Sequence, residues 1–317
     1  CDPKNEKVDI IGNVKRQFYL EHHLEELNEI TVVGKGEKEN ALVSSEKLTE
    51  AELAQSRGKS LGESLKQLNG VNALQTGPTI SKPVIHGLHS NRVLIMNNNV
   101  RQEGQQWGQE HAPEIDPFSG ADFSVIKGAS SIKYGADAIG GIVLVQPKPL
   151  ARSKSFNGDA STVVNSNNRQ FVVAGKVAGG TEKGIGWRLQ GSAKKGGDAK
   201  AANYSLSNTG VREKNFSAAI GLNKSNHGME VYFSHFESDI AILRSAHIGN
   251  VTDLINAINS DRPIFIEEFT YQLDNPRQEV KHDLLKLTGR WKLADKGEIK
   301  FQYAFQANSR REYDRRR

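Results

Sequence analysis

Apolar and polar residues alternate along several long segments in the second half of the chain. In residues 299–307 every second side chain is apolar, namely Ile299, Phe301, Tyr303, Phe305 and Ala307. Residues 281–293, 186–195 and 215–223 repeat this pattern. Because successive side chains of a strand point to opposite faces, the pattern predicts long strands with one apolar and one polar face.

About seven strands of this kind are predicted, near residues 156–165, 169–178, 185–194, 211–223, 229–238, 279–293 and 297–310. Soluble β-sandwiches also contain alternating strands. Three features favour a transmembrane β-barrel instead: strands of about ten residues, a strongly charged polar face, and tryptophans near strand ends at Trp187 and Trp291.

Residues 30–150 mix helix and strand. Thr49 followed by Glu52 has the form of a helix cap, and a second helix is predicted over Ser60–Leu68, with Gly70 just past its end. Apolar runs predict further strands at Arg92–Met96, Ser124–Lys127 and Ile142–Val145, with turns at Asn97–Asn99 and Gly128–Ser131. This part of the chain is therefore an α+β domain.

Composition excludes several classes of protein. Hydrophobic residues make up 37% of the chain and charged residues 25%, with a mean hydropathy of −0.55. No segment approaches the roughly 18 apolar residues of a membrane-spanning helix. The net charge of +5 is not organised into a recognisable nucleic-acid-binding module, so no nucleic acid partner is expected. No nucleophile elbow or metalloprotease helix is present, so we expect neither an enzyme nor a resident cofactor.

The segment Lys127–Val145 carries the most specific motif. A strand is followed by Gly128 and small residues, then by Tyr134-Gly135, and then by Gly140-Gly141 entering an apolar strand. Together with the upstream strand that begins at Arg92, this order resembles the plug domain of TonB-dependent outer-membrane receptors. The family usually has an Asp-Gly turn after the upstream strand, and this chain has Asn97-Asn98 there.

The resemblance implies a domain organisation. Residues 30–150 would form the plug, and residues 151–317 the first strands of an antiparallel transmembrane β-barrel. Plugged outer-membrane transporters have about 22 strands, so seven would leave the barrel incomplete, and we expect it to continue beyond Arg317. Residues 1–29 resemble the C-terminal end of a small β-sandwich domain, of the carboxypeptidase regulatory-like type, with its linker. That domain precedes the plug in Bacteroidetes-type receptors.

The resemblance also implies a function, which is energised uptake of a scarce ligand across the outer membrane. A periplasmic TonB-type energy-coupling protein would add a strand to Glu29, Ile30, Thr31, Val32 and Val33, which otherwise form an ordinary first plug strand. The other expected partners are outer-membrane lipid and a small ligand. The alternatives are a non-transporting surface binding or signalling receptor of the same architecture and a soluble β-rich adhesin. Cys1 is either a free thiol or a lipid-modified N-terminus.

The candidate ligand residues lie between Trp107 and Asp116. Glu110, His111, Glu114 and Asp116, with His86 and His89 nearby in sequence, offer nitrogen and oxygen ligands to a metal ion, metal complex or haem. Plugs of zinc-type receptors resemble this stretch. A haem would use His111, His235 or His247 as axial ligand, whereas a siderophore or oligosaccharide would use Trp107, Arg101 and Gln106. A solvated apical loop without a ligand is the plainer interpretation.

Overall fold

The computed structural model describes residues 44–108, 110–246, 250–293 and 296–314. The chain divides into two compact units, residues 1–41 and 42–317, and all the described residues belong to the second. The expected regulatory-like β-domain at residues 1–29 and the expected coupling segment Glu29–Val33 therefore lie outside the described residues.

The N-terminal part of the second unit is an α+β domain built on a five-stranded sheet. The sheet has the order β1-β6-β7-β4-β5, and β4 and β7 are parallel. A separate hairpin is formed by β2 and β3. In chain order the elements are β1 (Ser44–Lys47), α1 (Glu50–Gln55), α2 (Leu61–Leu65), β2 (Val71–Thr76), β3 (Ile80–Ile85), η1 (Ser90–Arg92), β4 (Val93–Asn97), β5 (Val100–Arg101), β6 (Asp122–Lys127), η2 (Gly128–Tyr134), η3 (Ala136–Ala138) and β7 (Gly141–Gln146).

Local chemistry sets both helix starts. The backbone N–H of Thr49 donates to the Glu52 carboxylate at 2.7 Å, and Glu52 N–H donates back to the Thr49 hydroxyl at 3.3 Å, which confirms the predicted cap. The second helix begins after Ser60 as predicted but ends at Leu65, because only a tighter turn follows it before Gly70 adopts a positive φ of 67°. Among the described residues, no helix is long and apolar enough to cross a membrane.

The core of the α+β domain is apolar and closed to water. It joins α2 to one face of the sheet through fully buried side chains such as Leu65, Ile95, Val125 and Val143. Burying one such side chain contributes about 1.5–3 kcal/mol. This domain therefore has a stabilising core of its own and can present a polar exterior to its surroundings.

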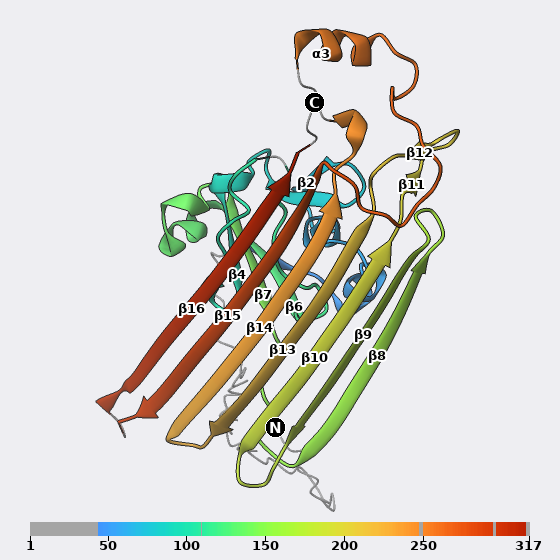
Figure 1. Ribbon diagram of the computed structural model, residues 1–317. Coiled ribbons are helices and arrows are strands. Elements are labelled where there is room, and N and C mark those ends of the chain that lie inside the picture. The colour runs from blue at the N-terminus through green and yellow to red at the C-terminus, as the bar shows by residue number, and fades with distance from the viewer. Residues whose placement is uncertain (1–43, 109, 247–249, 294–295, 315–317) are drawn as a thin grey trace, which may run out of the picture. The chain divides into compact units, whose positions relative to one another are not determined.

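A seven-stranded antiparallel sheet follows, which we call the wall. Its order is β16-β15-β14-β13-β10-β9-β8 (Figure 1). The strands are β8 (Ser155–Asn165), β9 (Gln170–Gly180), β10 (Ile185–Gly196), β13 (Val211–Asn223), β14 (His227–Ala241), β15 (Arg277–Lys292) and β16 (Glu298–Tyr313). All seven predicted strands are confirmed, with ends within a few residues of those expected. Two short strands, β11 (Ala199–Lys200) and β12 (Ser205–Leu206), and helix α3 (Val251–Ile258) lie in its loops and were not predicted.

The wall is open rather than closed. Within the described residues, β8 pairs only with β9 and β16 pairs only with β15. An incomplete barrel was expected from the strand count, and this open sheet agrees with it.

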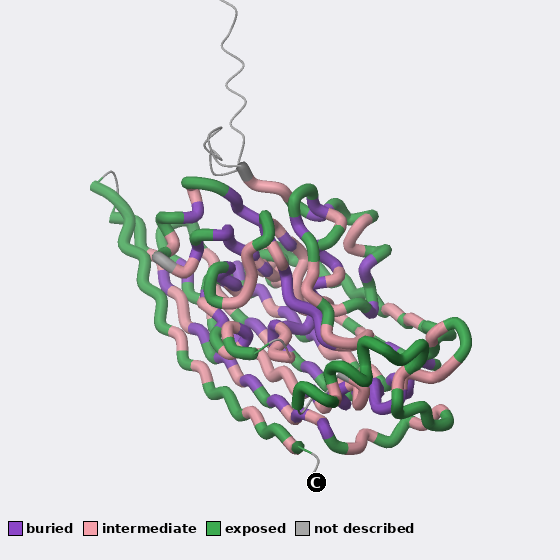
Figure 2. Tube along the Cα trace, turned by 90° about the horizontal axis from the view of Figure 1, so that it is seen from above, coloured by how far each residue is buried: buried purple, intermediate pink, exposed green. Residues whose placement is uncertain are grey.

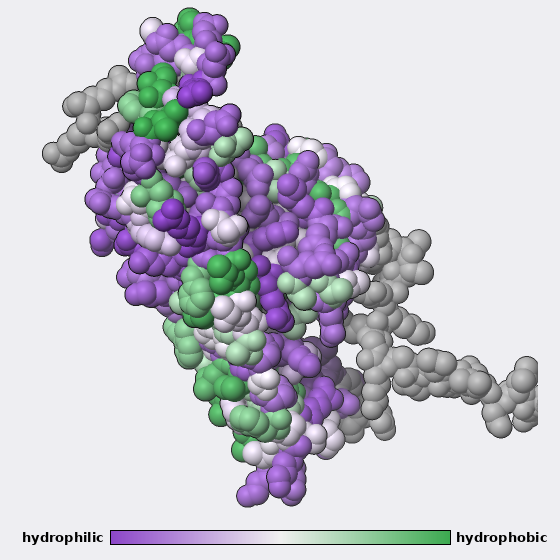
Figure 3. Space-filling model, turned by 90° about the vertical axis from the view of Figure 1, so that its right-hand side faces the viewer, coloured by the Kyte–Doolittle hydropathy of each residue, from purple (hydrophilic) through white to green (hydrophobic). Residues whose placement is uncertain are grey.

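The two faces of the wall are inverted relative to a water-soluble sheet. The outer face, on odd positions of β15 and β16, keeps Leu285 40% and Phe305 55% exposed, whereas the inner face buries His282, Lys286 and Arg188 to 5% or less. Buried residues accordingly alternate with more exposed ones along the inner strands in Figure 2, whereas the edge strands β8 and β16 are exposed along most of their length. Viewed from the side, apolar patches lie below the mostly hydrophilic upper part (Figure 3). A sheet that buries its charges and exposes its apolar side chains suits a lipid surround.

The two ends of the wall also differ. Turns of a few residues, 181–184, 224–226 and 293–297, join strands at what we call the short-turn end, whereas segments 197–210 and 242–276 make up much of the opposite, long-loop end. Trp187 and Trp291 both lie near the short-turn end, beside Phe156 and Phe301 respectively. Short turns at one end and long loops at the other are typical of outer-membrane barrels, whose long loops are extracellular.

A charge placed on the outer face should be costly. We expect Leu285→Arg, near the middle of β15, to destabilise the membrane-inserted protein by about 2–4 kcal/mol, because the arginine enters the apolar band. Leu254→Arg on α3 is a matched control, since Leu254 is 42% exposed but lies in a loop, and it should change stability by no more than about 0.5 kcal/mol. Urea titration of folding in lipid vesicles measures both. Equal small effects would contradict a lipid-facing outer surface.

Candidate functional site at the plug–wall interface

Residues 97–119 of the α+β domain lie against the inner face of the wall. Several wall side chains donate to backbone carbonyls of this segment: Gln302 to Asn99 at 3.2 Å, Gln306 to Arg101 at 3.0 Å and Gln278 to Glu110 at 2.7 Å. Backbone carbonyls without partners are costly to bury. The wall therefore supplies hydrogen bonds that the loop cannot make for itself.

Glu114 is the centre of this interface. Its carboxylate accepts hydrogen bonds from His282 Nδ1 at 2.7 Å, from Arg310 Nη2 at 2.6 Å and from the Asn308 amide. The side chains of Glu114 and His282 are each only 3% exposed. The other ring nitrogen of His282 lies 3.0 Å from the side-chain amide oxygen of Gln306. Three wall side chains from β15 and β16 therefore converge on the single Glu114 carboxylate.

Asp116 forms a second buried contact with the wall. Its carboxylate accepts from Gln190 Nε2 at 2.7 Å and from the Ser192 hydroxyl at 2.8 Å, while its other oxygen accepts from the backbone of Phe118. Burial raises the pKa of Asp116, and the three donors oppose that rise. Asp116 thus fixes the end of the loop to β10.

Lys82 supports the loop from within the α+β domain. Its side chain is fully buried, and its Nζ donates to the carbonyl oxygens of Trp107 and Gly108 at 2.9 and 2.6 Å. Burial, with the nearby Arg310 charge, lowers the pKa of Lys82 from 10.5 to about 8. The supported loop presents Trp107 to solvent, where its side chain is 71% exposed.

The candidate metal ligands are dispersed by the structure. His111 pairs with Glu312 at 2.6 Å, while Glu114 and Asp116 are each bound to different wall strands as described above. His86 lies beside Gly70 and His89 bonds to Ser90, both outside the loop. Across the ranges that the structure describes, no group of three His, Cys, Asp or Glu side chains is placed to hold a metal ion.

The two histidines of the barrel region that were candidate haem ligands are His235 and His247. His235 has the same parity on β14 as Val231 and Phe233, whose side chains are exposed on the outer face, and it pairs with Asp283 at 2.7 Å. His235 was expected in a barrel loop as an axial haem ligand, and the structure corrects that position, because it lies within strand β14. His247 lies outside the described residues.

The glycine motif fixes the end of the five-stranded sheet. A β-carbon at Gly140 would lie 2.8 Å from the Arg92 carbonyl oxygen, and Gly140 N–H donates to that oxygen at 2.7 Å. Gly141 has a φ of 134°, which side chains rarely tolerate. Gly128 begins the η2 segment and Gly135 caps it, with Tyr134 packed on a buried cluster. The predicted small-residue turn is thus a 3-10 segment.

Comparison with known proteins assigns the family. Residues 37–142 match the TonB-dependent Receptor Plug Domain. The vitamin B12 transporter BtuB of Photobacterium profundum is 26% identical over 212 residues, covering 63% of this chain and 34% of that protein. The chain belongs to the TonB-dependent outer-membrane receptors. We accordingly call the α+β domain the plug.

Other relatives and solved structures agree. The vitamin B12 transporter BtuB of Vibrio cholerae is 29% identical over 149 residues, covering 46% of this chain and 24% of that protein. In fold, the receptor resembles the ferric citrate transporter FecA, with a TM-score of 0.64 at 15% identity, covering 86% of this chain and 40% of that one. It likewise resembles the ferric enterobactin receptor of Pseudomonas aeruginosa, with a TM-score of 0.61 at 14% identity over 83% and 41% of the two chains. The chain spans about a third of the first relative's length.

Sequence reasoning missed the wall and plug residues that hold this interface. His282 and Arg310 bind a carboxylate far away in sequence, and Lys82 lies in strand β3, which was not predicted. A signal was present for His282, because it shares the polar parity of β15 with Lys286. The position of His282 on the polar face does not reveal that its partner is Glu114.

Removing the Glu114 charge should loosen the plug. Glu114→Gln leaves Arg310 without its buried counter-charge and His282 without its carboxylate partner, and we expect the free energy of opening of residues 97–119 to fall by about 3–5 kcal/mol. Hydrogen exchange of that segment in the receptor measures this. Glu110→Gln is the control, since the Glu110 carboxylate makes no hydrogen bond or ion pair with another described residue. Equal protection in the two variants would refute the role of Glu114.

The lowered pKa of Lys82 gives a pH-dependent prediction. Between about pH 8 and 10.5 the unfolded chain holds a proton on Lys82 that the folded protein has released, so the free energy of unfolding rises with pH across this window. The Lys82→Met variant has no titrating group at this position, so it lacks this contribution to the pH dependence of unfolding. The difference in stability between wild type and Lys82→Met should therefore move in favour of wild type from pH 8 to 10.5, as measured by urea unfolding at each pH. A difference independent of pH would show that Lys82 is not perturbed.

Proposed function

We propose that this receptor takes up a scarce ligand across the outer membrane, driven by a periplasmic energy-coupling protein. The observation that carries this is the polar character of the plug–wall interface. Glu114, Asp116 and the carbonyls of residues 98–110 are held by hydrogen bonds and ion pairs. Each neutral hydrogen bond contributes only about 0.5–1.5 kcal/mol net. Water can replace such contacts when the plug moves, and the buried apolar clusters that plug and wall share are small, one around Ile80 and one around Val100.

The names of similar proteins support this proposal. They include vitamin B12 transporters, a ferric citrate transporter, a ferric enterobactin receptor and the copper transporter OprC, the last with a TM-score of 0.60 at 17% identity over 77% of this chain and 34% of that one. Most of these names include a metal ion or a metal complex. We propose accordingly that the ligand is a metal or metal complex rather than a peptide or polymer.

The ligand would bind at the long-loop end. Trp107 is exposed there on the supported loop, and Glu110 and His111 follow it beside the ends of β15 and β16. The loop between β14 and β15 adds a cavity of about 690 Å³, lined among others by Arg244, Arg262 and Phe265. Cavities of about 300–1,000 Å³ suit small ligands. Trp107, Glu110 and His111 would thus recognise the ligand from the plug side.

The coupling protein would act on the chain segment that precedes the plug. The segment Glu29, Ile30, Thr31, Val32 and Val33 has the β-branched composition of a strand that another chain can extend. Force applied there would reach the interface through β1, which pairs with β6 in the plug sheet.

Deleting Glu29–Val33 should abolish energised uptake while leaving ligand binding intact, because the pulled segment is lost and the binding face is not. Uptake by cells carrying the receptor and binding to isolated outer membranes are measured in parallel, with ferric, copper and corrinoid ligands as probes.

Deletion of residues 36–40, of equal length, is the control and should spare both. Uptake that survives the Glu29–Val33 deletion would refute the coupling assignment. Binding of a probe without any uptake by the wild-type receptor would favour the non-transporting alternative.

A further inference from the structure

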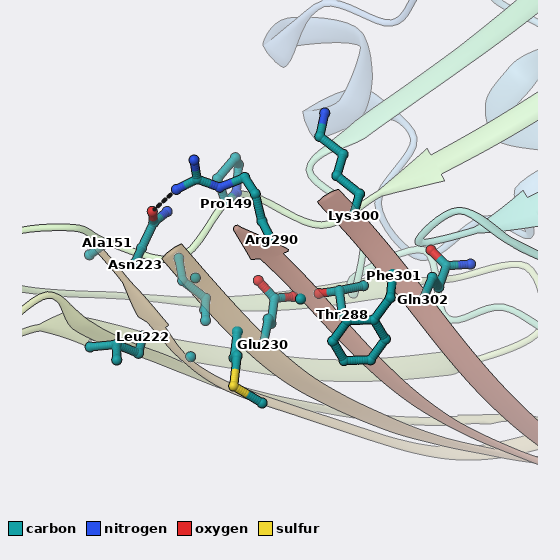
Figure 4. A pocket seen from close by; sticks show the side chains of 15 residues that line it. Pro149, Ala151, Leu222, Asn223, Glu230, Thr288, Arg290, Lys300, Phe301 and Gln302 are labelled. Atoms are coloured by element: carbon teal, nitrogen blue, oxygen red, sulfur yellow. Dashed lines mark hydrogen bonds between the residues drawn. The ribbon is translucent and has the colours of Figure 1, made fainter. Parts of the chain in front are cut away.

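A cavity lies at the short-turn end between the end of the plug and the wall. It has a volume of about 410 Å³ and is bounded by Pro149–Ala151 and the inner face of β13 to β16. Figure 4 shows Arg290 and Lys300 rising from neighbouring strands on the same side of the sheet. With Glu230, these are the charged side chains that line the cavity.

A small apolar cluster, which we call the seal, lies on the side of the cavity that faces the long-loop end. Val100 of the plug packs with Ala219, Tyr232 and Leu284 of the wall, and Leu150 covers this cluster. The segment after the plug can lie flat on the wall because Gly186 has no side chain, since a β-carbon there would come 2.3 Å from the Ala151 carbonyl oxygen. The seal therefore rests on the chain segment that leaves the plug.

Two wall cations lie at the level of this seal. Strand pairing places Arg188, Ala219, Tyr232 and Lys286 in one row across the inner face. Arg188 donates to the Lys148 carbonyl, while Lys286 donates to the Asn98 carbonyl and, at 2.9 Å, to the Asn98 side chain.

Among the described residues, neither cation has a carboxylate within ion-pair distance, and Glu230 acts on both only from further away. Within the described residues, no ion pair involves Arg188 or Lys286, and Arg188 Nη2 is buried without any hydrogen-bond partner. A buried charge held only by neutral groups is costly. Movement of Lys148 away from the wall would free Arg188 for another partner, and movement of Asn98 would free Lys286.

From this row to the short-turn end, the inner face carries an excess of positive charge. Glu298 is shared between Lys300 at 3.1 Å and Arg290 at 3.4 Å, so it does not neutralise both. The cations on inner-face positions are Arg188, Lys286, Arg290, Lys292 and Lys300, whereas the carboxylates are Glu230 and Glu298. By contrast, the charges nearer the long-loop end are paired, as in Glu114–Arg310 and Glu213–Lys194.

We propose that this part of the wall is an exit surface for an anion, so that the ligand carried past the plug bears a negative charge such as a carboxylate or other oxyanion. The proposal rests on the uptake function and names the charge of its ligand. When the plug moves, Arg188 and Lys286 lose their carbonyl partners and the passing anion replaces them. Arg290 and Lys300 then receive it at the cavity. Clefts lined by one sign of charge concentrate ions of the opposite sign.

Ion selectivity tests this with potassium chloride as the probe. The complete receptor is placed in planar lipid bilayers, urea is added to release the plug, and the zero-current potential is measured in a salt gradient. We expect Arg188→Gln/Lys286→Gln to lower the chloride-to-potassium permeability ratio severalfold. Lys200→Gln/Lys214→Gln, which removes two exposed charges away from the inner face, should leave the ratio unchanged. An unchanged ratio in the first variant overturns the proposal.

Glu230→Gln is a second variant in case the first does not insert. Removing this carboxylate from the cavity should raise the permeability ratio, and an unchanged or lower ratio would overturn the proposal equally. The bilayer measurement needs no coupling protein and no ligand. A receptor that fails to transport in cells but shows these shifts would refute the uptake function alone, whereas transport without these shifts would refute the anion surface alone.

Discussion

The buried carboxylate of Glu114, held by His282 and Arg310 of the wall, is the interaction on which the rest of the structure depends. The wall turns its apolar side chains outward, so its charged side chains must find partners inside. The plug supplies those partners, through Glu114 and Asp116 and through the carbonyls of its loop. Because a buried charge without a partner costs several kcal/mol, plug and wall specify each other's position. The apolar core of the plug lies elsewhere, around α2 and its own sheet.

This separation gives the interface two different ends. Toward the long loops, charges are paired and Lys82 supports a loop that exposes Trp107. Toward the short turns, Arg188 and Lys286 hold only carbonyls across a small apolar seal. The contacts at the long-loop end hold the plug and expose the loop that carries Trp107. The contacts at the short-turn end are weaker and can let the plug separate from the wall. A ligand moving between them would meet unneutralised positive charge only after the plug had begun to move.

Much of the fold was accessible from the sequence, because alternation and capping are local. The dyad pattern around Leu285 predicted the strands and their two faces, and Thr49 with Glu52 predicted a helix start. The contacts of Glu114 were not accessible, because its partners are separated from it by 168 residues or more and no local pattern links them. Helix α3 was missed although its signals are also local: Val251, Leu254, Ile255 and Ile258 have helical spacing and Asn250 caps its start, even though these apolar side chains are exposed rather than buried. The outward parity of His235 could have been read from the sequence, and it should have removed that residue from the ligand candidates.

The inverted arrangement of the wall is tested most directly by a nitroxide scan along β15 of the membrane-inserted receptor, one residue at a time from Lys281 to Trp291. Accessibility to oxygen dissolved in lipid should alternate with a period of two, high at odd positions such as Leu285 and Leu287. Labels at even positions such as His282 and Lys286 should be immobilised and shielded from it. A profile without alternation, or one in which the even positions face lipid, would contradict a wall that holds a polar plug against its inner face.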